Sequence, residues 1–413
     1  MNNKSSAPYS TQIAYLPADS NLPSSLTGVD RDVLYRVLPL CREVIEKAET
    51  FENDMWSAIP RSLEVSNKLD SLNGSILDVF HNLESELITS VQATSFETSD
   101  LAIRSVLANE PDDIFKGYSI YDRYFHVIRI AGPSMLQILG QVAKTSHMII
   151  NDLEYAMLSR DEFTFIINNI KTMFQYIVSN ASEQASNDIV FSGALDRKTD
   201  WQQEPEKAWE DNGESPTEWT HKVARYRWIT GHHLFNLCSI FCINYLNRAR
   251  EQFEKGIEVE GNELLRQAGF FLRGTTASMW YAASMPGNIY LKYVRPSMIS
   301  QESPNGFSGD QNAEYKRLKV SKALLENTLL RLYGAKRTQW PKYVKEAVNE
   351  FVEFDTRDCE AHTLIAAAMA GMDTSISQKQ WQQNLPPDFE HLNAVDLLRE
   401  ITVQRRQSFA GQI

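Results

Sequence analysis

The sequence predicts an all-α protein, and two observations lead to that prediction. Apolar residues recur at the three- and four-residue spacing of an amphipathic helix, for example at Val33, Val37, Leu40 and Val44. Patterns that alternate apolar and polar residues, which are typical of half-buried strands, are nearly absent. A chain of 413 residues is long enough for two packed domains.

Composition divides the chain into four parts. Residues 1–28 are rich in Ser, Pro, Asn and Gly and are expected to form a flexible arm. Residues 29–191 are expected to form a smaller helical N-terminal domain. Residues 192–219 are polar and acidic and contain Pro and Gly, which is typical of a linker or a long surface loop. Residues 220–413 are expected to form the larger helical domain.

Five helices are expected in this larger domain. The first begins near His221 and is apolar on all sides in its middle, so we expect it to be buried. The second, at about 262–283, ends before Pro286 and Gly287, because proline cannot continue the helical hydrogen bonds and glycine permits a turn. The others are expected at about 315–333, 340–370 and 394–406.

Charge and hydropathy exclude several kinds of partner. The net charge of -12 argues against nucleic acid, whose phosphates require basic patches. No apolar run reaches the roughly 18 residues of a membrane span, and the Ser- and Asn-rich start lacks the apolar core of a signal peptide. We therefore expect a cytoplasmic protein that binds neither nucleic acid nor membranes. The sequence leaves the oligomeric state open.

Established catalytic motifs are absent from the sequence. It contains no HExxH, GxSxG, P-loop or Rossmann glycine pattern, and no paired ExxH of di-iron bundles. Cys238 and Cys242 lie one helical turn apart in an apolar run. Without a second Cys or His pair at suitable spacing, they are expected to be buried thiols rather than a metal site.

Two segments between helices offer groups that could bind a ligand. In NIYLKYVRPSM, Arg295 precedes a proline, which favours an extended backbone and could hold the guanidinium at a pocket rim to bind a carboxylate. The alternative is a surface arginine paired with an acid. In PNGFSGDQN, Gly306 and Gly309 allow a sharp turn or the close approach of a flat ligand, although most such loops are plain connections.

Three histidines are candidates for the chemistry. His362 precedes a run of alanines, whose small side chains leave room for a large planar ring beside the helix. It could offer one ring nitrogen to a metal while Asp358 accepts a hydrogen bond from the other, although a lone helical histidine is ordinarily a core or surface residue. His232 and His233 point about 100° apart on a helix and cannot easily share one metal. One of them could face a pocket as a base or donor, or both could be polar residues near the start of a helix.

The order and spacing of these segments resemble the haem domain of the indoleamine 2,3-dioxygenase superfamily. The resemblance covers about residues 230–406, whereas residues 30–200 match no family that we can name. In chain order the matching segments are MPGNIYLKYVRPSM, GFSGDQN, a helix from Tyr315, QWPKYVKEAVNEF, RDCEAHTLIAAA and NAVDLLREITVQRR.

The resemblance implies an indoleamine 2,3-dioxygenase-like helical haem domain that binds haem b, with His362 as the ligand of the iron. Arg295 resembles the arginine that binds the substrate carboxylate, and Tyr290 resembles the aromatic residue that packs on the substrate ring. Gly309 matches the first glycine of a loop on the distal side.

On the oxygen side, the resemblance places His232, His233 or Asn236. A histidine there is similar to tryptophan 2,3-dioxygenase rather than to indoleamine 2,3-dioxygenase. The chain also departs from the pattern at Asp310, where the family has a second glycine, and in its C-terminal loop. These departures favour a specialised branch of the superfamily, such as the one that includes monodechloroaminopyrrolnitrin synthase.

The sequence therefore predicts a haem-dependent oxygenase or dioxygenase that uses O2 on a small indole- or tryptophan-like aromatic substrate, in a biosynthetic or catabolic pathway. The alternatives are a non-catalytic haem sensor or carrier, and a helical interaction module in which His362 is an ordinary residue. Haem absorption separates the last alternative from the others, and oxygen consumption with indole substrates separates the first two.

Overall fold

The computed structural model describes residues 14–17, 22, 37–48, 79, 82, 121–130, 133, 135–153, 156, 158–182, 218–299, 309–370 and 403. These residues are mostly helical, which confirms the predicted all-α class. The chain forms two compact units. The larger contains Met1–Leu22, Phe96–Pro133 and Pro216–Ile413, and the smaller contains Pro23–Ser95 and Ser134–Ser215.

This division differs from the predicted domains in two places. Phe96–Pro133, expected in the N-terminal domain, belongs to the larger unit. Ala14–Pro17, expected in the flexible arm, forms strand β1, which pairs in parallel with β2, Val127–Ile130. Ala14 and Leu16 are fully buried, so pairing with a distant strand orders this part of the arm. Four residues are too few to show a strand pattern in the sequence.

The smaller unit contains helix α5, Met135–Leu153, helix α6, Arg160–Ser182, and a helical stretch at 37–48. The start of α6 is set by a capping box, in which Ser159 N donates to Glu162 Oε2 at 2.7 Å and Glu162 N donates to Ser159 Oγ at 3.3 Å. The apolar face of α5, which includes Leu139 and Val142, is buried, as its periodicity requires.

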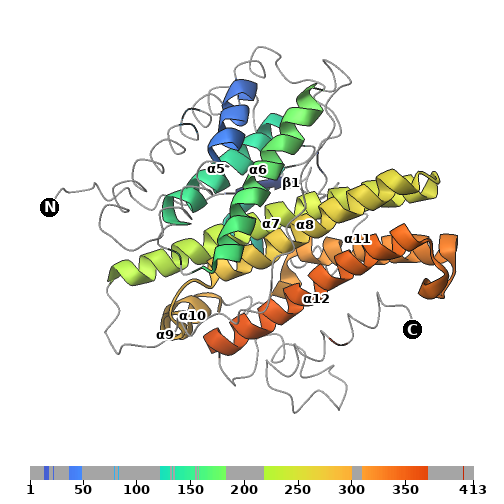
Figure 1. Ribbon diagram of the computed structural model, residues 1–413. Coiled ribbons are helices and arrows are strands. Elements are labelled where there is room, and N and C mark those ends of the chain that lie inside the picture. The colour runs from blue at the N-terminus through green and yellow to red at the C-terminus, as the bar shows by residue number, and fades with distance from the viewer. Residues whose placement is uncertain are drawn as a thin grey trace. The chain divides into compact units, whose positions relative to one another are not determined.

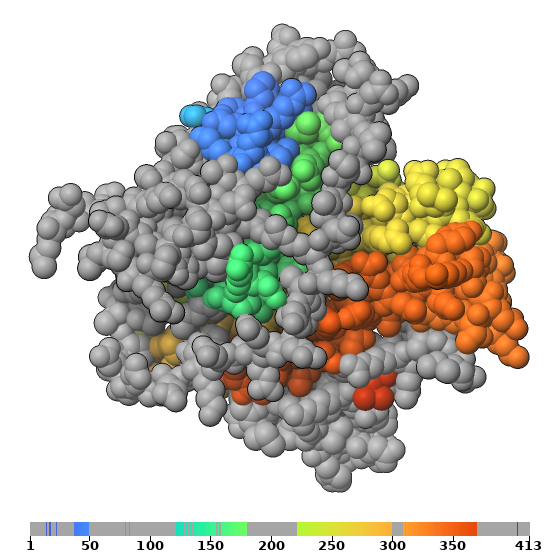
Figure 2. Space-filling model, in the orientation of Figure 1, coloured from blue at the N-terminus to red at the C-terminus, as the bar shows by residue number. Residues whose placement is uncertain are grey.

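Four long helices make up most of the described part of the larger unit. They are α7, Glu218–Glu254, α8, Glu258–Ala282, α11, Ala313–Tyr333, and α12, Lys342–Ala370. Helix α7 packs along α8 and α11, and α12 packs along α8 (Figure 1). Gly256 and Gly334 end α7 and α11 with φ angles of 75° and 83°, a conformation that favours glycine. Both turns lie at the surface, in yellow and orange (Figure 2).

Short helical turns connect α8 to α11. They are α9, Gly287–Ile289, the π-helix η1, Tyr290–Val294, α10, Arg295–Ser297, and the 3-10 helix η2, Gly309–Gln311. A further 3-10 helix, η3, Arg337–Gln339, precedes α12. The predicted extended backbone at Arg295 is wrong, because φ is -58° and ψ is -45° there. The following proline lies in the first turn of α10, where its fixed φ is compatible with a helix.

Other predictions lie outside the described residues. They concern the linker up to residue 217, the loop at 300–308 and, apart from Val403, the C-terminal helix at 394–406. The predicted burial of Cys238 and Cys242 is confirmed, and all four cysteines are buried and outside disulfides. Among the helices that the structure describes, none has both the length and the apolar character needed to cross a bilayer.

Candidate functional site

Aromatic side chains from three segments of the larger unit meet around His232. Trp228 and His232 lie one turn apart on α7, and their ring centroids are 4.4 Å apart. Phe125, just before β2, stacks on His232 with centroids 4.1 Å apart and planes at 21°. The ring centroid of Tyr290, the first residue of η1, lies 5.5 Å from that of Trp228. Phe125 and Tyr290, which are about 165 residues apart in the chain, thus belong to one aromatic cluster.

His232 is held as a neutral imidazole. Its Nδ1 lies 2.6 Å from the carbonyl oxygen of Trp228, an arrangement in which Nδ1–H donates and Nε2 keeps its lone pair. The pKa of His232 is lowered to about 3, mainly by burial and to a lesser extent by the nearby His233 and His362, while the hydrogen bond to the Trp228 carbonyl opposes this shift. An imidazole in this state can accept a proton or bind a metal through Nε2.

His233 points away from His232 and is hydrogen-bonded to the backbone of another segment. It is buried, and its Nε2 lies 2.6 Å from the carbonyl oxygen of Phe125. Adjacent helical residues diverge by about 100°, so the structure agrees with the expectation that the two histidines do not share one ligand. The sequence named both as catalytic candidates, and the contacts distinguish them.

His362 lies on α12, on the helix face that continues three and seven residues later with Ile365 and Met369. Those two residues belong to an apolar core with Ile289 and Val294 of the α9–η1 segment. The His362 side chain is exposed, yet close enough to His232 for its charge to lower the pKa of that residue. The structure therefore brings together two histidines that are far apart in sequence.

Asp358, the predicted partner of His362, anchors α12 to α8. Its Oδ1 accepts hydrogen bonds from Thr275 Oγ1 at 3.1 Å and from Thr276 Oγ1 at 2.9 Å. One turn earlier, the buried Lys322 of α11 donates to Asp355 Oδ1 at 2.7 Å. These contacts hold the helix that carries His362. A hydrogen bond from His362 to Asp358 stays a prediction.

Tyr290 and Arg295 lie near each other. Burial raises the pKa of Tyr290 to about 12, and the positive charge of Arg295 opposes that rise. Nearby, Tyr124 OH and Ser297 Oγ are hydrogen-bonded at 2.7 Å. Arg295 is half-buried, and this position beside a phenol differs from that of a freely solvated surface arginine.

Asn236 and Gly309 lie at the junction of α7 and the start of α11. Asn236 is fully buried, and its Oδ1 accepts from Asn312 Nδ2 at 2.7 Å. Among the described residues, Asn236 Nδ2 has no hydrogen-bond partner. Gly309 is exposed, and no described atom comes within 4 Å of the place where a Cβ would lie. The close approach of a ligand to Gly309 stays a prediction.

Sequence reasoning missed Phe125, Trp228 and the segment Tyr121–Ile130. Trp228 lies four residues before His232, and this helical spacing was the signal that could have revealed it. Phe125 is part of YDRYFHV, a dense aromatic cluster, but the sequence placed it in the N-terminal domain. Only the folded chain shows that this cluster reaches α7.

These residues fit a haem. Among the residues that the structure describes, no three or more His, Cys, Asp or Glu side chains gather into a metal site. A haem iron needs only one or two protein ligands, because the pyrrole nitrogens fill the equatorial positions. His362 offers an exposed imidazole, and His232 offers Nε2 of a neutral ring whose other nitrogen is bound to a carbonyl. The aromatic cluster supplies the apolar surroundings that a porphyrin requires.

An all-α unit with these two imidazoles is compatible with the class of helical haem proteins. A family model, SfmD 3-methyl-L-tyrosine peroxygenase, matches residues 58–335, which is more than half of the chain, and the chain therefore belongs to this family. Searches of curated proteins and of solved structures found no match.

Family membership confirms that the chain is a haem-dependent oxidoreductase, and it supports a small aromatic substrate. His232, Tyr290, Arg295 and Gly309 lie within the matched residues, whereas His362 lies beyond their end. The assignment of His362 as iron ligand therefore depends on its position in the fold and on the order of motifs in the sequence.

Proposed function

We propose that the chain is a haem-dependent peroxygenase that transfers one oxygen atom from hydrogen peroxide to the ring of a tyrosine-like amino acid, with water as the second product. The family's name supports peroxide as the oxidant and a methylated tyrosine as the kind of substrate. The observation that carries the proposal is the neutral His232, held within an aromatic cluster and close to His362.

His362 would ligate the iron, and bound haem would supply the iron chemistry that activates peroxide. His232 would accept the peroxide proton at Nε2 and return it to the departing oxygen as water forms. A pKa of about 3 keeps this ring unprotonated and makes it release the proton readily. Phe125 and Trp228 border the imidazole and would exclude bulk water. Tyr290 would pack on the substrate ring, and Arg295 would bind its carboxylate.

The reaction is tested by supplying the haem-loaded protein with tyrosine, 3-methyltyrosine and tryptophan, each with isotope-labelled peroxide or with O2. We expect one labelled oxygen atom in the product of a phenolic amino acid, and no product from O2 alone. Insertion of two oxygen atoms into tryptophan with O2 would support the dioxygenase that the sequence predicted. Haem binding without any turnover would support a sensor or carrier.

Replacing His362 by alanine is expected to abolish stable haem binding, because alanine removes the imidazole that would ligate the iron. The measurement is the Soret absorbance per protein after reconstitution and desalting. His147→Ala, on α5 of the smaller unit, is the matched control and should bind haem like the wild type. Wild-type haem content and spectrum in His362→Ala would show that the ligand assignment is wrong.

Arg295→Leu is expected to weaken binding of the amino-acid substrate on the order of 30-fold or more, because a desolvated guanidinium–carboxylate contact is worth roughly 2–5 kcal/mol. Titration of the haem spectrum with substrate measures this affinity. The half-buried Arg266, replaced by leucine in the same way, serves as the control. Loss of haem rather than of substrate affinity would instead assign Arg295 to a haem propionate. Unchanged haem content and substrate affinity would remove Arg295 from the site.

A further inference from the structure

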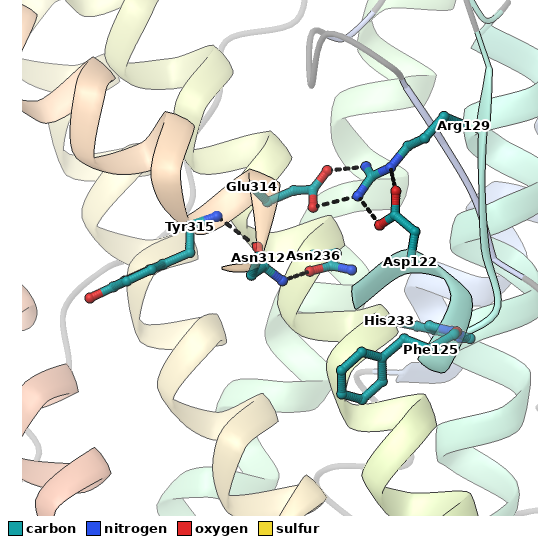
Figure 3. A network of polar contacts seen from close by, with 8 residues as sticks. All are labelled: Asp122, Phe125, Arg129, His233, Asn236, Asn312, Glu314 and Tyr315. Atoms are coloured by element: carbon teal, nitrogen blue, oxygen red, sulfur yellow. Dashed lines mark hydrogen bonds and ion pairs between the residues drawn. The ribbon is translucent and has the colours of Figure 1, made fainter. Parts of the chain in front are cut away.

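Arg129 is the centre of a buried ion cluster in the segment Tyr121–Ile130 (Figure 3). Its Nε and Nη2 bind the two carboxylate oxygens of Asp122 at 2.8 and 2.6 Å. Its two Nη atoms bind the carboxylate of Glu314, which is fully buried at the start of α11. Charges that are closed off from water cannot lose a partner without leaving an uncompensated charge. The ion pairs of Arg129 with Asp122 and Glu314, here called the Arg129 clamp, therefore hold the segment Tyr121–Ile130 against α11.

The same segment is fastened to α7 at Phe125. The carbonyl oxygen of Phe125 accepts a hydrogen bond from His233 Nε2. The next residue, His126, has a φ of 54°, a left-handed conformation that residues with a Cβ adopt rarely and keep only where the surroundings hold them. Beyond it, β2 pairs with β1. The backbone around Phe125 is thus held on both sides.

A third link joins α7 directly to the start of α11. Asn312 caps α11 by accepting from Tyr315 N at 2.7 Å, and it donates through Nδ2 to Asn236 Oδ1 on α7 (Figure 3). Glu314, the acceptor of the Arg129 clamp, lies two residues further along α11. These contacts therefore fix α7, α11 and the segment Tyr121–Ile130 relative to one another.

The consequence of this arrangement is the position of the Phe125 ring. It stacks on the imidazole of His232 at 4.1 Å, while Trp228 borders the same imidazole at 4.4 Å. Between these rings His232 has little freedom to rotate, so Nδ1 stays on the Trp228 carbonyl and the direction of Nε2 is fixed. A group that transfers a proton needs this defined orientation.

We propose that Phe125 is a positioning residue for His232, and that the Arg129 clamp and His233 hold Phe125 in that place. The chemical role of His232 rests on the proposed function, whereas its shielding by Phe125 is a property of the fold. His233, a catalytic candidate from the sequence, acts through the Phe125 backbone in this proposal.

The test measures how fast diethyl pyrocarbonate modifies His232 in the full chain without added haem, by peptide mapping in wild type and in Phe125→Leu. Leucine keeps an apolar side chain but removes the stacked ring. Because an aromatic pair of this kind shifts an equilibrium by about two- to tenfold, the modification rate of His232 should rise by about that factor. The rate at His362 should stay at its wild-type value.

The matched control is Phe271→Leu, which removes a fully buried ring of α8 that stacks on Phe241 at 5.1 Å, away from His232. It should lower the thermal midpoint without raising the rate at His232. A wild-type rate in Phe125→Leu, or an equal rise in both variants, would overturn the proposal. Because this readout needs neither haem nor turnover, its failure is distinguishable from failure of the peroxygenase assignment.

Discussion

Arg129→Met is expected to destabilise the protein by about 3–5 kcal/mol, the cost of leaving buried carboxylates without their counter-ion. In the wild type, burial raises the pKa of Glu314, but the charge and hydrogen bonds of Arg129, together with Arg317 and a backbone hydrogen bond, lower it below its usual value. At Asp122 burial dominates and raises the pKa to about 6. In the variant, Arg317 remains, among the described residues, as the positive charge that acts on both carboxyls. Denaturant unfolding, followed by the fluorescence of α7 tryptophans, measures the loss.

The destabilisation of Arg129→Met should depend on pH in a defined direction. Without Arg129, burial raises the pKa of both carboxyls in the folded protein above their unfolded values. The folded state then binds protons more tightly than the unfolded state, so stability rises as the pH falls. The deficit relative to wild type should be smaller at about pH 5 than at about pH 8.

Arg266→Met is the matched control for this prediction. Arg266 pairs with Glu263 at 3.7 Å and with Glu350 at 3.5 Å, but all three side chains are partly exposed to solvent. Its removal should cost about 0–1 kcal/mol. Equal effects of the two substitutions would show that the Arg129 cluster is not closed to water.

Gly231→Ala is expected to destabilise the larger unit by about 1–3 kcal/mol, because α7 and α8 cross in direct backbone contact at this residue. A Cβ on Gly231 would lie 2.6 Å from Ala282 Cβ and 2.8 Å from Ala282 Cα. The backbone of α8 cannot turn aside as a side chain can. The direction of the change in the free energy of unfolding is informative, because a Gly→Ala substitution in an unconstrained helix stabilises by roughly 1 kcal/mol.

The effect of Gly231→Ala should extend to haem, because His232 is the next residue. Unfolding midpoints and haem content after reconstitution measure the two effects. Gly269→Ala is the control: its Cβ would come within 2.8 Å of the Phe354 ring, a half-buried side chain that can move. We expect Gly269→Ala to cost less stability and to keep haem. A gain in stability from Gly231→Ala would contradict the close crossing of α7 and α8.

The long helices were predictable because their signals are local. The helices expected from near His221 and at 262–283, 315–333 and 340–370, and the stop before Pro286, agree with the structure within a few residues. The wrong prediction at Arg295 has a local origin as well. A residue before proline usually adopts an extended conformation, but here a π-helix leads directly into α10 and keeps Arg295 helical.

The candidate site was predictable only in part. Motif order directed attention to His362, Tyr290 and Arg295, and the structure places Tyr290 beside Arg295. The sequence could not choose between His232 and His233, because both have the same helical context. They differ in the backbone carbonyl to which each imidazole is hydrogen-bonded, that of Trp228 for His232 and that of Phe125 for His233.

The sequence alone was sufficient for features that depend on neighbouring residues. These are the helical class, the places where helices end and the histidine on an alanine-rich helix. The pairing of β1 with β2, the aromatic cluster on His232 and the Arg129–Glu314 contact join positions far apart in the chain, 185 residues apart in the last case. Such contacts depend on which helix faces pack together and on which charges are buried together. Local periodicity carries no information about either choice, so these features emerged only from the folded structure.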